Sequence, residues 1–544
     1  MEDFIFSSLL TDELKLIEHR ISHRGVQHAH EIDPFDPLPD QEVTIRVHTS
    51  VDFPADHVTC YYTLDGSEPV GSRGLAQKGL ALSLHQVGCE WDNLIWGYVT
   101  LWEGTLPAQT DGVVMRYRIS AWSQSGVETF CDYPDVKSTV EQAARAYFHK
   151  EPPPNQLVGD LAKGTIFTIS IDRHQPPQWA RQAVLYHIFV DRFYPGKRKE
   201  WQQTSNLKGF CGGTLGGVTE KLAYISDLGA TCLWLSPIFP SPTHHGYDAT
   251  DYERVEPRLG GDDALRELVT AAHSQGLRVI LDLVCNHLSN QHPIFVKASA
   301  DPQSPYRDWF EFNDSEIGYR TYFGVRSMPR INLTNPEARK WMLDIARYWL
   351  RKFDVDGFRL DHAVGPDPGF WSDFWTACKR EKPDVLCFGE MVEPPPILRR
   401  FIGRMDGALD FILADAFRRT FARKNIQEDA FYTFLDQHLS YFPEEFLMFN
   451  FLDNHDMDRF LFIAGGDKRL LTQAASVQMR MPGPPIIYYG TEVGLSQPQG
   501  KVREIGLESS RMPMLWGEEQ DKDLLNFYKE IIQQRSEMKP WINR

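Results

Sequence analysis

The chain has 544 residues with 42% hydrophobic content, enough to bury a large core, and its length suggests two or three domains. Its formal charge of −17, from 57 basic and 74 acidic residues, argues against nucleic acid as a partner. No stretch is long and apolar enough to cross a bilayer, and the start has no basic segment followed by a long apolar run. The eight cysteines form no CxxC pair, which favours buried thiols in a reducing compartment. We therefore expect a cytoplasmic protein without a membrane partner.

Residues 1–150 carry strand patterns without helical periodicity, namely EVTIRVHTS, HVTCYYTLDGSEP, GYVTLWEG and VVMRYRISAWSQSG. Turn residues such as the Asp65-Gly66 pair separate these strands, which predicts an antiparallel, Ig-like β-sandwich. Residues 151–175 begin with the proline run EPPP, and we expect a stiff extended connector there.

From 176 to 544, apolar strands alternate with amphipathic helices. The expected strands are YHIFV, CLWLSPI, RVILDLV, DVDGFRL, VLCFGE, EFLMFNFL and PIIYYG, and LLNFYKEII would form the eighth helix. This alternation predicts an α/β fold, a (β/α)₈ TIM barrel. Residues 288–335 interrupt it with many aromatic residues and little helical period, so we expect a small insertion domain after the third strand.

Three acids follow directly after runs of strand-forming residues: Asp361, Glu390 and Asp456. In a parallel barrel the strand ends meet at one rim, so we expect these acids to share one site. Arg359 lies two residues before Asp361, so both side chains point to the same face of the strand. Hydrolysis of an acetal between sugars needs one carboxylate at the anomeric carbon and one protonated carboxyl at the leaving oxygen, and this set supplies both.

The motifs resemble the α-amylase family of glycoside hydrolases. Its four principal motifs are matched, in order, by DLVCNH at 282–287, GFRLDH at 357–362, FGE at 388–390 and FLDNHD at 451–456. Supporting matches are AVLYHIFVDRFYPG, HGYDATDY, MPRIN and YYGTE, and together they cover roughly residues 176 to 540. MPRIN and the N-terminal sandwich look like the cyclomaltodextrinase, neopullulanase and maltogenic amylase group.

The resemblance implies a role for each acid. Asp361 would be the nucleophile, Glu390 the general acid and then base, and Asp456 the acid that holds the hydroxyls of the distorted sugar. The residues implied to bind substrate are Tyr247, Asp248, His287, Arg359, His362 and His455. The implied reaction is retaining hydrolysis of α-glucosidic bonds in short or cyclic maltodextrins through a covalent glucosyl-enzyme intermediate, with an α-glucan oligosaccharide as the partner.

The same resemblance bears on cofactors and assembly. No cofactor is required by the chemistry, but Asn286 matches a position that binds Ca²⁺ in many amylases, so calcium stays open. The N-terminal sandwich helps form a dimer in the cyclomaltodextrinase group, which implies a homodimer through that domain. Most family members continue into a C-terminal β-sandwich, which we expect to be absent here.

The departures from the family pattern leave the substrate open. Asp361 is followed by HAVGP where the cyclomaltodextrinase group commonly has VANE, and Met391 follows Glu390. These positions line the side of the cleft that receives the leaving group or acceptor. The preference for α-1,4 or α-1,6 bonds therefore stays open, and so does the choice between hydrolysis and transfer by a 4-α-glucanotransferase.

Two further alternatives come from other classes. A metal hydrolase would use as ligands Asp282, His287, Asp361, Glu390, His455 and Asp456. Metal-dependent barrels of this kind require a His-x-His pair on the first strand, and YHIFVDRF lacks it. Arg359 would also repel a cation at this site. A non-catalytic glucan-binding protein usually lacks one of the three acids, and all three are present here.

Overall fold

The structure is a computed structural model. Its described residues fall into several ranges with gaps between them: 16, 19–20, 22–23, 25–50, 53, 55–124, 126–131, 164–196, 200–202, 207–500 and 506–535. Parts of the expected sandwich (132–150) and of the expected connector (151–163) lie outside the described residues.

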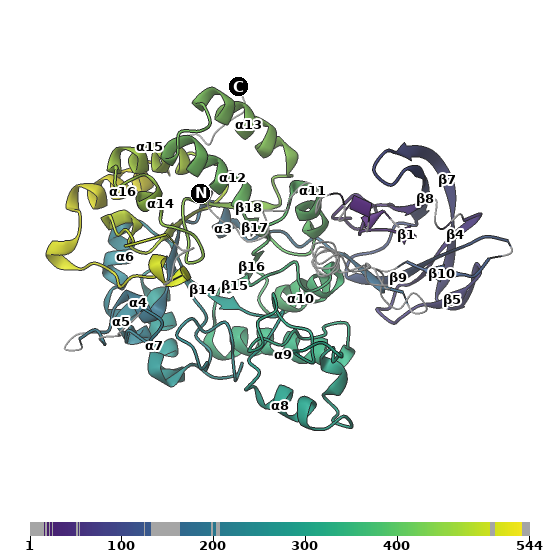
Figure 1. Cartoon of the computed structure of the whole chain (residues 1–544), viewed down its shortest axis with the longest axis horizontal. Helices are drawn as coiled ribbons and strands as arrows, with labels where there is room; N and C mark the ends of the chain where they lie inside the picture. Colours follow the sequence, from purple (N-terminus) through teal and green to yellow (C-terminus); the bar gives the residue numbers. More distant parts are fainter. Residues whose placement is uncertain are drawn as a thin grey trace.

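Eight parallel strands form a closed barrel, which confirms the predicted (β/α)₈ architecture (Figure 1). The first strand pairs with the last, and this pairing closes the barrel. The strands are β12 (Leu185–Ile188), β13 (Cys232–Leu235), β14 (Arg278–Leu283), β15 (Gly357–Leu360), β16 (Leu386–Gly389), β17 (Gly407–Leu409), β18 (Leu447–Phe451) and β19 (Pro485–Tyr488).

The strand patterns located seven of these strands and missed β17. Its three residues, Gly407–Leu409, are too few to show a periodicity. The tight fit of this strand requires its glycine, because a Cβ on Gly407 would lie 2.0 Å from the carbonyl oxygen of Leu447. Packing against β18 therefore places this strand, rather than its own propensity.

Helices surround the barrel. The helix α9 begins after Asn335, whose side chain accepts hydrogen bonds from the backbone N–H groups of Glu337 and Ala338, with Pro336 at the first helical position. The longer helices are α7 (Gly261–Ser274), α9 (Pro336–Phe353), α10 (Pro368–Glu381), α13 (Glu428–Tyr441), α15 (Lys468–Gln478) and α16 (Lys522–Arg535). The shorter ones are α3 (Gln178–Gln182), α4 (Val190–Phe193), α5 (Leu215–Glu220), α6 (Leu222–Leu228), α8 (Pro293–Ala300), α11 (Pro395–Leu398), α12 (Phe411–Phe417) and α14 (Phe460–Ile463).

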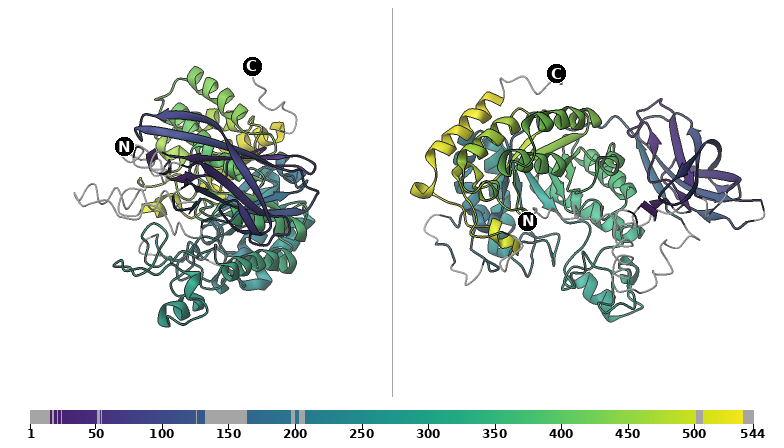
Figure 2. Two further views of the ribbon diagram at one scale, coloured as in Figure 1. Left: turned by 90° about the vertical axis from the view of Figure 1, so that its right-hand side faces the viewer. Right: turned by 45° about the horizontal axis from the view of Figure 1, so that its top comes forward.

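The segment between β14 and α9 forms a lobe beside the barrel that contains α8 (Figure 2). Phe295 packs edge-on against Phe310 and Tyr319 inside this lobe, which has little regular structure. Most of its aromatic rings thus fill its own small core. Tyr322 and Phe323 are the exception, because they reach the cavity described below.

The N-terminal domain is antiparallel and β-rich. The long strand β7 pairs with β4 along its first half and with β8 along its second, so it passes from one sheet to the other. Side chains of β3, β4 and β9 share one buried core between the sheets. The strands are β1 (Val26–Gln27), β2 (Ile32–Asp33), β3 (Val43–Thr49), β4 (His57–Thr63), β5 (Val70–Ser72), β6 (Leu75–Lys78), β7 (Leu80–Asp92), β8 (Gly97–Leu106), β9 (Val113–Trp122), β10 (Thr129–Phe130) and β11 (Phe167–Ile171).

The last of these strands differs from expectation, because β11 lies within the range expected to be a connector. It pairs with β9 along its whole length and buries all five side chains in the N-terminal domain. The domain meets the barrel at α10, where Arg116 of β9 forms an ion pair with Asp373 at 3.1 Å and Ser170 contacts Thr376 at 3.1 Å. This helix follows β15, the strand that leads to Asp361.

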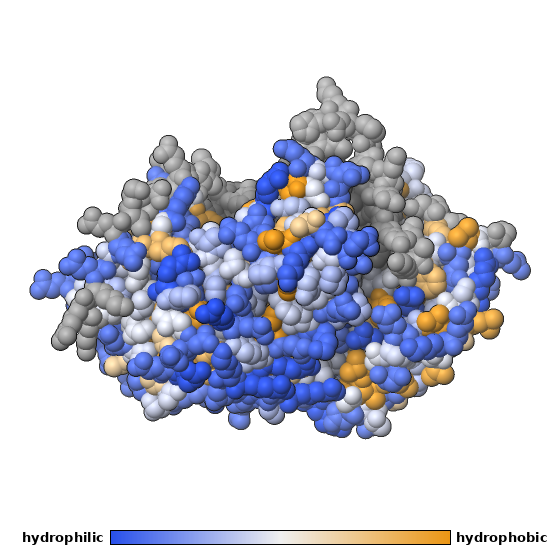
Figure 3. Space-filling model, turned by 90° about the horizontal axis from the view of Figure 1, so that it is seen from below, coloured by the Kyte–Doolittle hydropathy of each residue, from blue (hydrophilic) through white to orange (hydrophobic). Residues whose placement is uncertain are grey.

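The described part of the chain contains no helix long and apolar enough to cross a membrane. Large exposed apolar side chains gather instead on the N-terminal domain, and Figure 3 shows apolar groups toward the end of the molecule that this domain occupies. They are Val70, Leu75, Leu80, Val87, Trp91, Leu94, Trp96, Tyr98 and Val127.

Candidate active site

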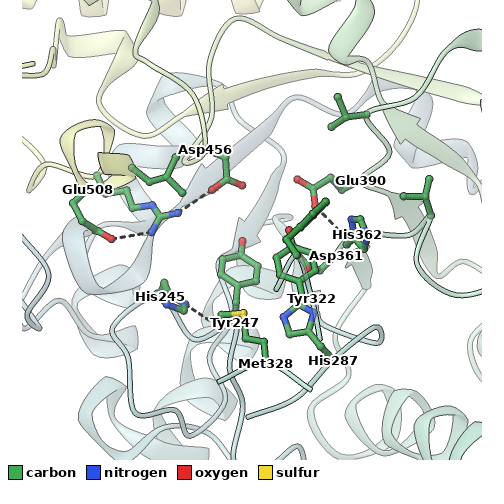
Figure 4. Close-up of a pocket in the computed structure, with 15 residues that line it drawn as sticks. His245, Tyr247, His287, Tyr322, Met328, Asp361, His362, Glu390, Asp456 and Glu508 are labelled. Atoms are coloured by element: carbon green, nitrogen blue, oxygen red, sulfur yellow. Dashed lines mark hydrogen bonds and ion pairs between the residues drawn. The ribbon is translucent and has the colours of Figure 1, made fainter. Parts of the chain in front are cut away.

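The three acids line one cavity of about 240 Å³ at the carboxyl ends of the barrel strands. Asp361 directly follows β15 and Glu390 directly follows β16, while Asp456 stands five residues beyond β18. Figure 4 shows Asp361 and Glu390 on one side of the cavity and Asp456 on the other, with Tyr247 between them. The fold thus brings together three residues that are far apart in the sequence.

Arg359 is completely buried beneath the cavity and holds the acids of one side. Its Nη1 donates hydrogen bonds to Asp361 Oδ1 at 2.8 Å and to Asp282 Oδ1 at 2.7 Å. Its Nη2 lies 2.8 Å from Glu390 Oε2, but without hydrogen-bond alignment. One guanidinium therefore serves three carboxyl groups, and its hydrogen bonds favour the anionic form of Asp361 over that of Glu390.

Burial raises the pKa of Glu390 and of Asp361, because water no longer solvates their charged forms. The charge of Arg359 opposes the rise, and the negative charge of Asp456 adds to it in both cases. The backbone N–H of His362 donates to Glu390 Oε2 at 3.1 Å. With three acids around a single cation, this side of the cavity keeps a proton to a higher pH than free carboxyl groups would.

On the opposite side of the cavity, Asp456 is surrounded by cationic and hydrogen-bond donor groups. Although burial alone would raise it, contacts with His455 and Arg511 hold the pKa of Asp456 well below its usual range. His455 Nε2 lies 2.9 Å from Asp456 Oδ2, and Arg511 Nη2 donates to Oδ1 at 2.9 Å. Asp456 is therefore a fixed anion that faces the cavity.

Tyr247 forms the floor between the two sides. Its hydroxyl donates to Asp282 Oδ2 at 3.0 Å and lies 2.6 Å from His455 Nε2. Its ring is parallel to that of His455, with centroids 5.4 Å apart. Tyr247 lines the cavity, whereas His455 and Arg359 lie behind it and position the groups that do.

Histidines and aromatic rings form the remaining wall. His287 lines the cavity, and its buried Nε2 has no hydrogen-bond partner among the residues the structure describes, so that nitrogen remains for a ligand. Its ring stacks on Tyr322, and His362 stands edge-on to Tyr322 and Phe323. His362 also holds a left-handed backbone conformation, with φ of 42°, which is rare for a side chain of this size.

Asp248 lies apart from the other predicted binding residues. It is buried and accepts a hydrogen bond from Ser241 Oγ at 2.6 Å and another from Thr243. These bonds hold the loop that carries Tyr247, and Asp248 does not line the cavity. Its predicted part in substrate binding stays a prediction.

The motifs missed two charged residues that line the cavity. Glu508 and Arg511 follow β19 and form an ion pair at 3.3 Å. His244 Nε2 donates to Glu508 Oε2 at 2.8 Å. The pattern that locates both residues is their place after the last barrel strand, since loops at that end of a barrel line the active site.

Comparison with known proteins decides the family. A family profile for the alpha amylase catalytic domain matches residues 187–539, more than half of the chain. The chain belongs to the α-amylase family. It is a glycoside hydrolase, as the motifs predicted.

Individual members of the α-amylase family are similar over much of their length. Alpha-amylase 2 of Dictyoglomus thermophilum is 41% identical over 537 residues, which cover 98% of this chain and 86% of that protein. Neopullulanase 2 of Thermoactinomyces vulgaris is 35% identical over 380 residues, which cover 66% of this chain and 63% of that protein. A solved cyclomaltodextrinase superposes with a TM-score of 0.63 at 26% identity, covering 94% of this chain and 85% of that one. The predicted resemblance to the cyclomaltodextrinase and neopullulanase group is confirmed.

The α-amylase family implies calcium at Asn286, so its surroundings test the fit. The Asn286 side chain is buried, and its Nδ2 lies 3.3 Å from His287 Nδ1. Within the described ranges, no group of three His, Cys, Asp or Glu ligands includes a neighbour of Asn286. A group of acidic side chains that would favour Ca²⁺ is therefore not gathered around Asn286 in the described ranges, and we derive no step through the ion.

The metal-hydrolase alternative meets the same test. None of its six proposed ligands belongs to a group that could hold a metal ion in the described part of the chain. Arg359 occupies the centre between Asp282, Asp361 and Glu390, the position a cation would need.

Proposed function

We propose that this enzyme hydrolyses α-glucosidic bonds in short or cyclic maltodextrins with retention of configuration, through a covalent glucosyl-enzyme intermediate. The observation that carries the proposal is the shared contact of Asp361 and Glu390 with the two arms of the Arg359 guanidinium, at 2.8 Å each, on the wall of one cavity. Two carboxyl groups beside each other on adjacent strands suit the close spacing of a retaining glycosidase.

The hydrogen bonds support a division of roles between the two acids, with Asp361 ionised and Glu390 protonated. Arg359 donates to Asp361, which favours its anion as the nucleophile at the anomeric carbon. Glu390 lacks an aligned hydrogen bond from that guanidinium, so we assign to Glu390 the proton that the leaving oxygen needs. After the leaving sugar departs, the Glu390 carboxylate takes a proton from water, and that water releases glucose from Asp361.

The other side of the cavity supports the sugar during this step. Asp456 is held anionic by Arg511, so it accepts hydrogen bonds from sugar hydroxyls and offsets the positive charge of the oxocarbenium-like transition state. His287 Nε2 faces the same space and bonds a further hydroxyl. Tyr247 places its ring below the sugar, where aromatic faces suit C–H surfaces.

Relatives support the substrate class. The neopullulanase and the cyclomaltodextrinase share this fold, and their names denote pullulan and cyclic maltodextrins as substrates. In this chain the cavity is walled by Tyr322, Phe323 and Met328 of the insertion, which favours short or cyclic chains over the long helices of starch.

A product analysis tests the proposal. The enzyme is incubated with β-cyclodextrin, maltotriose, pullulan or starch, and products are resolved by size while NMR follows the first anomer formed. We expect faster cleavage of the small and cyclic substrates and the α anomer first. Preference for starch would contradict the substrate class, and the β anomer first would contradict the intermediate.

The second candidate function is transfer by a 4-α-glucanotransferase, and one observation favours keeping it. His362 and Val392, just beyond the nucleophile and the general acid, line the cavity where water and a second sugar compete for the intermediate. Products longer than the starting maltotriose would establish transfer.

We further propose a homodimer through the N-terminal domain, supported by the eight large exposed apolar residues between Val70 and Tyr98. Light scattering on the purified enzyme should give twice the 62.6 kDa mass of one chain. A monomeric mass over the working concentration range would reject this assembly.

We also propose a cytoplasmic location. All eight cysteines are free, and all except Cys89 are buried, as expected for a protein made in a reducing compartment. Fractionation of the source cells should recover the hydrolase with cytoplasmic markers, and recovery outside the cell would reject the proposal.

A further inference from the structure

A group of metal-ligating side chains lies in the N-terminal domain. His19 Nε2 lies 2.7 Å from Asp92 Oδ2, and His19, His23 and Asp92 place ligand atoms within 4.8 Å of one another. It is the only such group of His, Cys, Asp and Glu in the ranges that the structure describes. Figure 1 places β7, which ends at Asp92, on the side of the molecule remote from the barrel.

The hydrogen bond of His23 is compatible with a role as a metal ligand. Its Nδ1 lies 2.8 Å from the carbonyl oxygen of His19, which can only accept, so Nδ1 carries the proton. The second nitrogen, Nε2, then holds a free electron pair. Metal-binding histidines usually donate their other N–H to a backbone carbonyl in this way, because the bond fixes both the tautomer and the direction of the ring.

Asp92 is fixed from the opposite segment. Its Oδ1 accepts hydrogen bonds from the backbone N–H of Leu94 at 2.7 Å and of Ile95 at 3.1 Å, which leaves Oδ2 toward His19. Arg20 Nε donates to the carbonyl oxygen of Leu94 at 3.1 Å and ties the two segments together. The ligands thus come from two parts of the chain 73 residues apart.

Two imidazoles and one carboxylate form the ligand set of a borderline divalent transition metal such as Zn²⁺, with a water in the fourth position. Hard cations such as Ca²⁺ and Mg²⁺ prefer all-oxygen sites. The site is open to water, since the side chains of His19 and Asp92 are 28% and 15% exposed. We propose that His19, His23 and Asp92 bind one Zn²⁺-like ion, which clamps His19 and His23 to the end of β7.

Ion entry changes one contact and the tautomer of His19. Zinc bonds of about 2.0 Å in a tetrahedral site keep ligand atoms about 3.3 Å apart, so the 2.7 Å contact of His19 with Asp92 opens by less than 1 Å. His19 Nε2 donates to the carboxylate in this structure, so when the ion binds Nε2 that proton leaves and the neutral imidazole carries its proton on Nδ1 instead.

The test is a metal titration of the full-length, untagged enzyme after removal of metal with a chelator. Zn²⁺ binding is measured by calorimetry, and Co²⁺ is added separately because its visible absorption reports a tetrahedral site. The variants are His23→Gln and Asp92→Asn, of which the second keeps the oxygen that bonds Leu94 and Ile95. His85→Gln, an exposed histidine on β7, is the matched control.

The unmodified enzyme and the His85→Gln control should bind one equivalent of Zn²⁺ and give the Co²⁺ spectrum. Loss of a ligand should weaken binding by about 100-fold or more, since loss of supporting groups alone costs 10–100-fold. Circular dichroism and maltotriose hydrolysis should stay unchanged in all variants, which separates this site from the catalytic one. No uptake by the unmodified enzyme, or equal uptake by His23→Gln and Asp92→Asn, would overturn the proposal and leave a simple histidine–aspartate ion pair.

Discussion

The two sides of the cavity hold largely buried acids whose pKa values are shifted in opposite directions. On one side, Arg359 serves three carboxyl groups, and the pKa values of Asp361 and Glu390 are raised. On the other side, Arg511 serves Asp456 and Glu508, each of which also contacts a histidine, and the pKa values of both acids are lowered. Burial alone therefore does not set the protonation state. The protonation state depends on how many cationic and hydrogen-bond donor groups surround each carboxyl group.

Removing Asp361, the proposed nucleophile, should cause the largest effect on the first side. We expect Asp361→Asn to lower kcat/KM by about 10⁴-fold or more, because an amide cannot form the glucosyl-enzyme. The same substitution should not reduce the stability of the fold. A folded-state pKa above the unfolded value means that ionised Asp361 costs stability as pH rises, so the neutral amide should not lower the Tm at pH 7.

Kinetics on maltotriose measure the expected loss of kcat/KM, and a thermal melt of the same samples measures the Tm. As a control, Asp308→Asn changes an acid outside the cavity and should leave both values unchanged. A Tm well below that of the unmodified enzyme in Asp361→Asn would mean that this acid supports the fold and that the lost activity is secondary.

Loss of Glu390, the proposed general acid, should have an effect that depends on the leaving group. Glu390→Gln should lower kcat/KM on maltotriose by about 10²–10⁴-fold, since no proton reaches the glycosidic oxygen. A maltosyl fluoride needs little protonation of its leaving group, so its hydrolysis should fall much less. Equal losses on both substrates would assign Glu390 a role other than proton donor.

Electrostatic coupling between Asp456 on one side and Glu390 on the other should be visible in the pH dependence of kcat. The negative charge of Asp456 helps to raise the pKa of Glu390, so Asp456→Asn should lower that pKa. The proton on Glu390 would then be lost at a lower pH, and the alkaline limb of kcat should move toward acid. The rate itself should fall by about 10²–10³-fold, as when one electrostatic stabiliser is removed.

A full pH profile of the residual activity of Asp456→Asn measures this shift. The exposed variant Glu316→Gln, outside the cavity, should keep the profile of the unmodified enzyme. A limb that stays in place or moves toward alkali would show that the two sides are not electrostatically coupled.

The difference between the two sides also explains what could be read from the sequence. Asp361, Glu390 and Arg359 lie at or directly after regular strands, so local pattern and the geometry of a barrel rim were enough to bring them together. Glu508 and Arg511 lie in a segment with little regular structure, and only the tertiary fold carries them to Asp456. Their interaction is non-local and leaves no periodic pattern.

The positions of two strands also depend on packing that the local sequence pattern does not show. The strand β17 is placed by its neighbours, and β11 follows a proline-rich stretch that reads as a connector. Asp248 matches a family motif by position, yet its hydrogen bonds are made within its own loop. A motif fixes which residues are present, whereas their partners depend on packing.

The smallest expected effect concerns stability on the second side. Although burial alone would raise it, the hydrogen bond from His244 and the charge of Arg511 lower the pKa of Glu508 from 4.5 to about 2. A lowered folded-state pKa gives stability that is present above the unfolded pKa and is lost as pH falls from 4.5 toward 2. Glu508→Gln should therefore lower the free energy of unfolding by about 3 kcal/mol at pH 7, and by much less at pH 3.

Urea unfolding at both pH values measures this difference, with the exposed Glu518→Gln as a control that should match the unmodified enzyme. The comparison with Asp361→Asn is the informative one. Neutralising an acid should destabilise the enzyme at pH 7 only on the side where Arg511 and His244 supply its partners. A loss in Glu508→Gln that is equal at pH 7 and pH 3 would arise from packing and not from charge, and the electrostatic contrast between the two sides would fail.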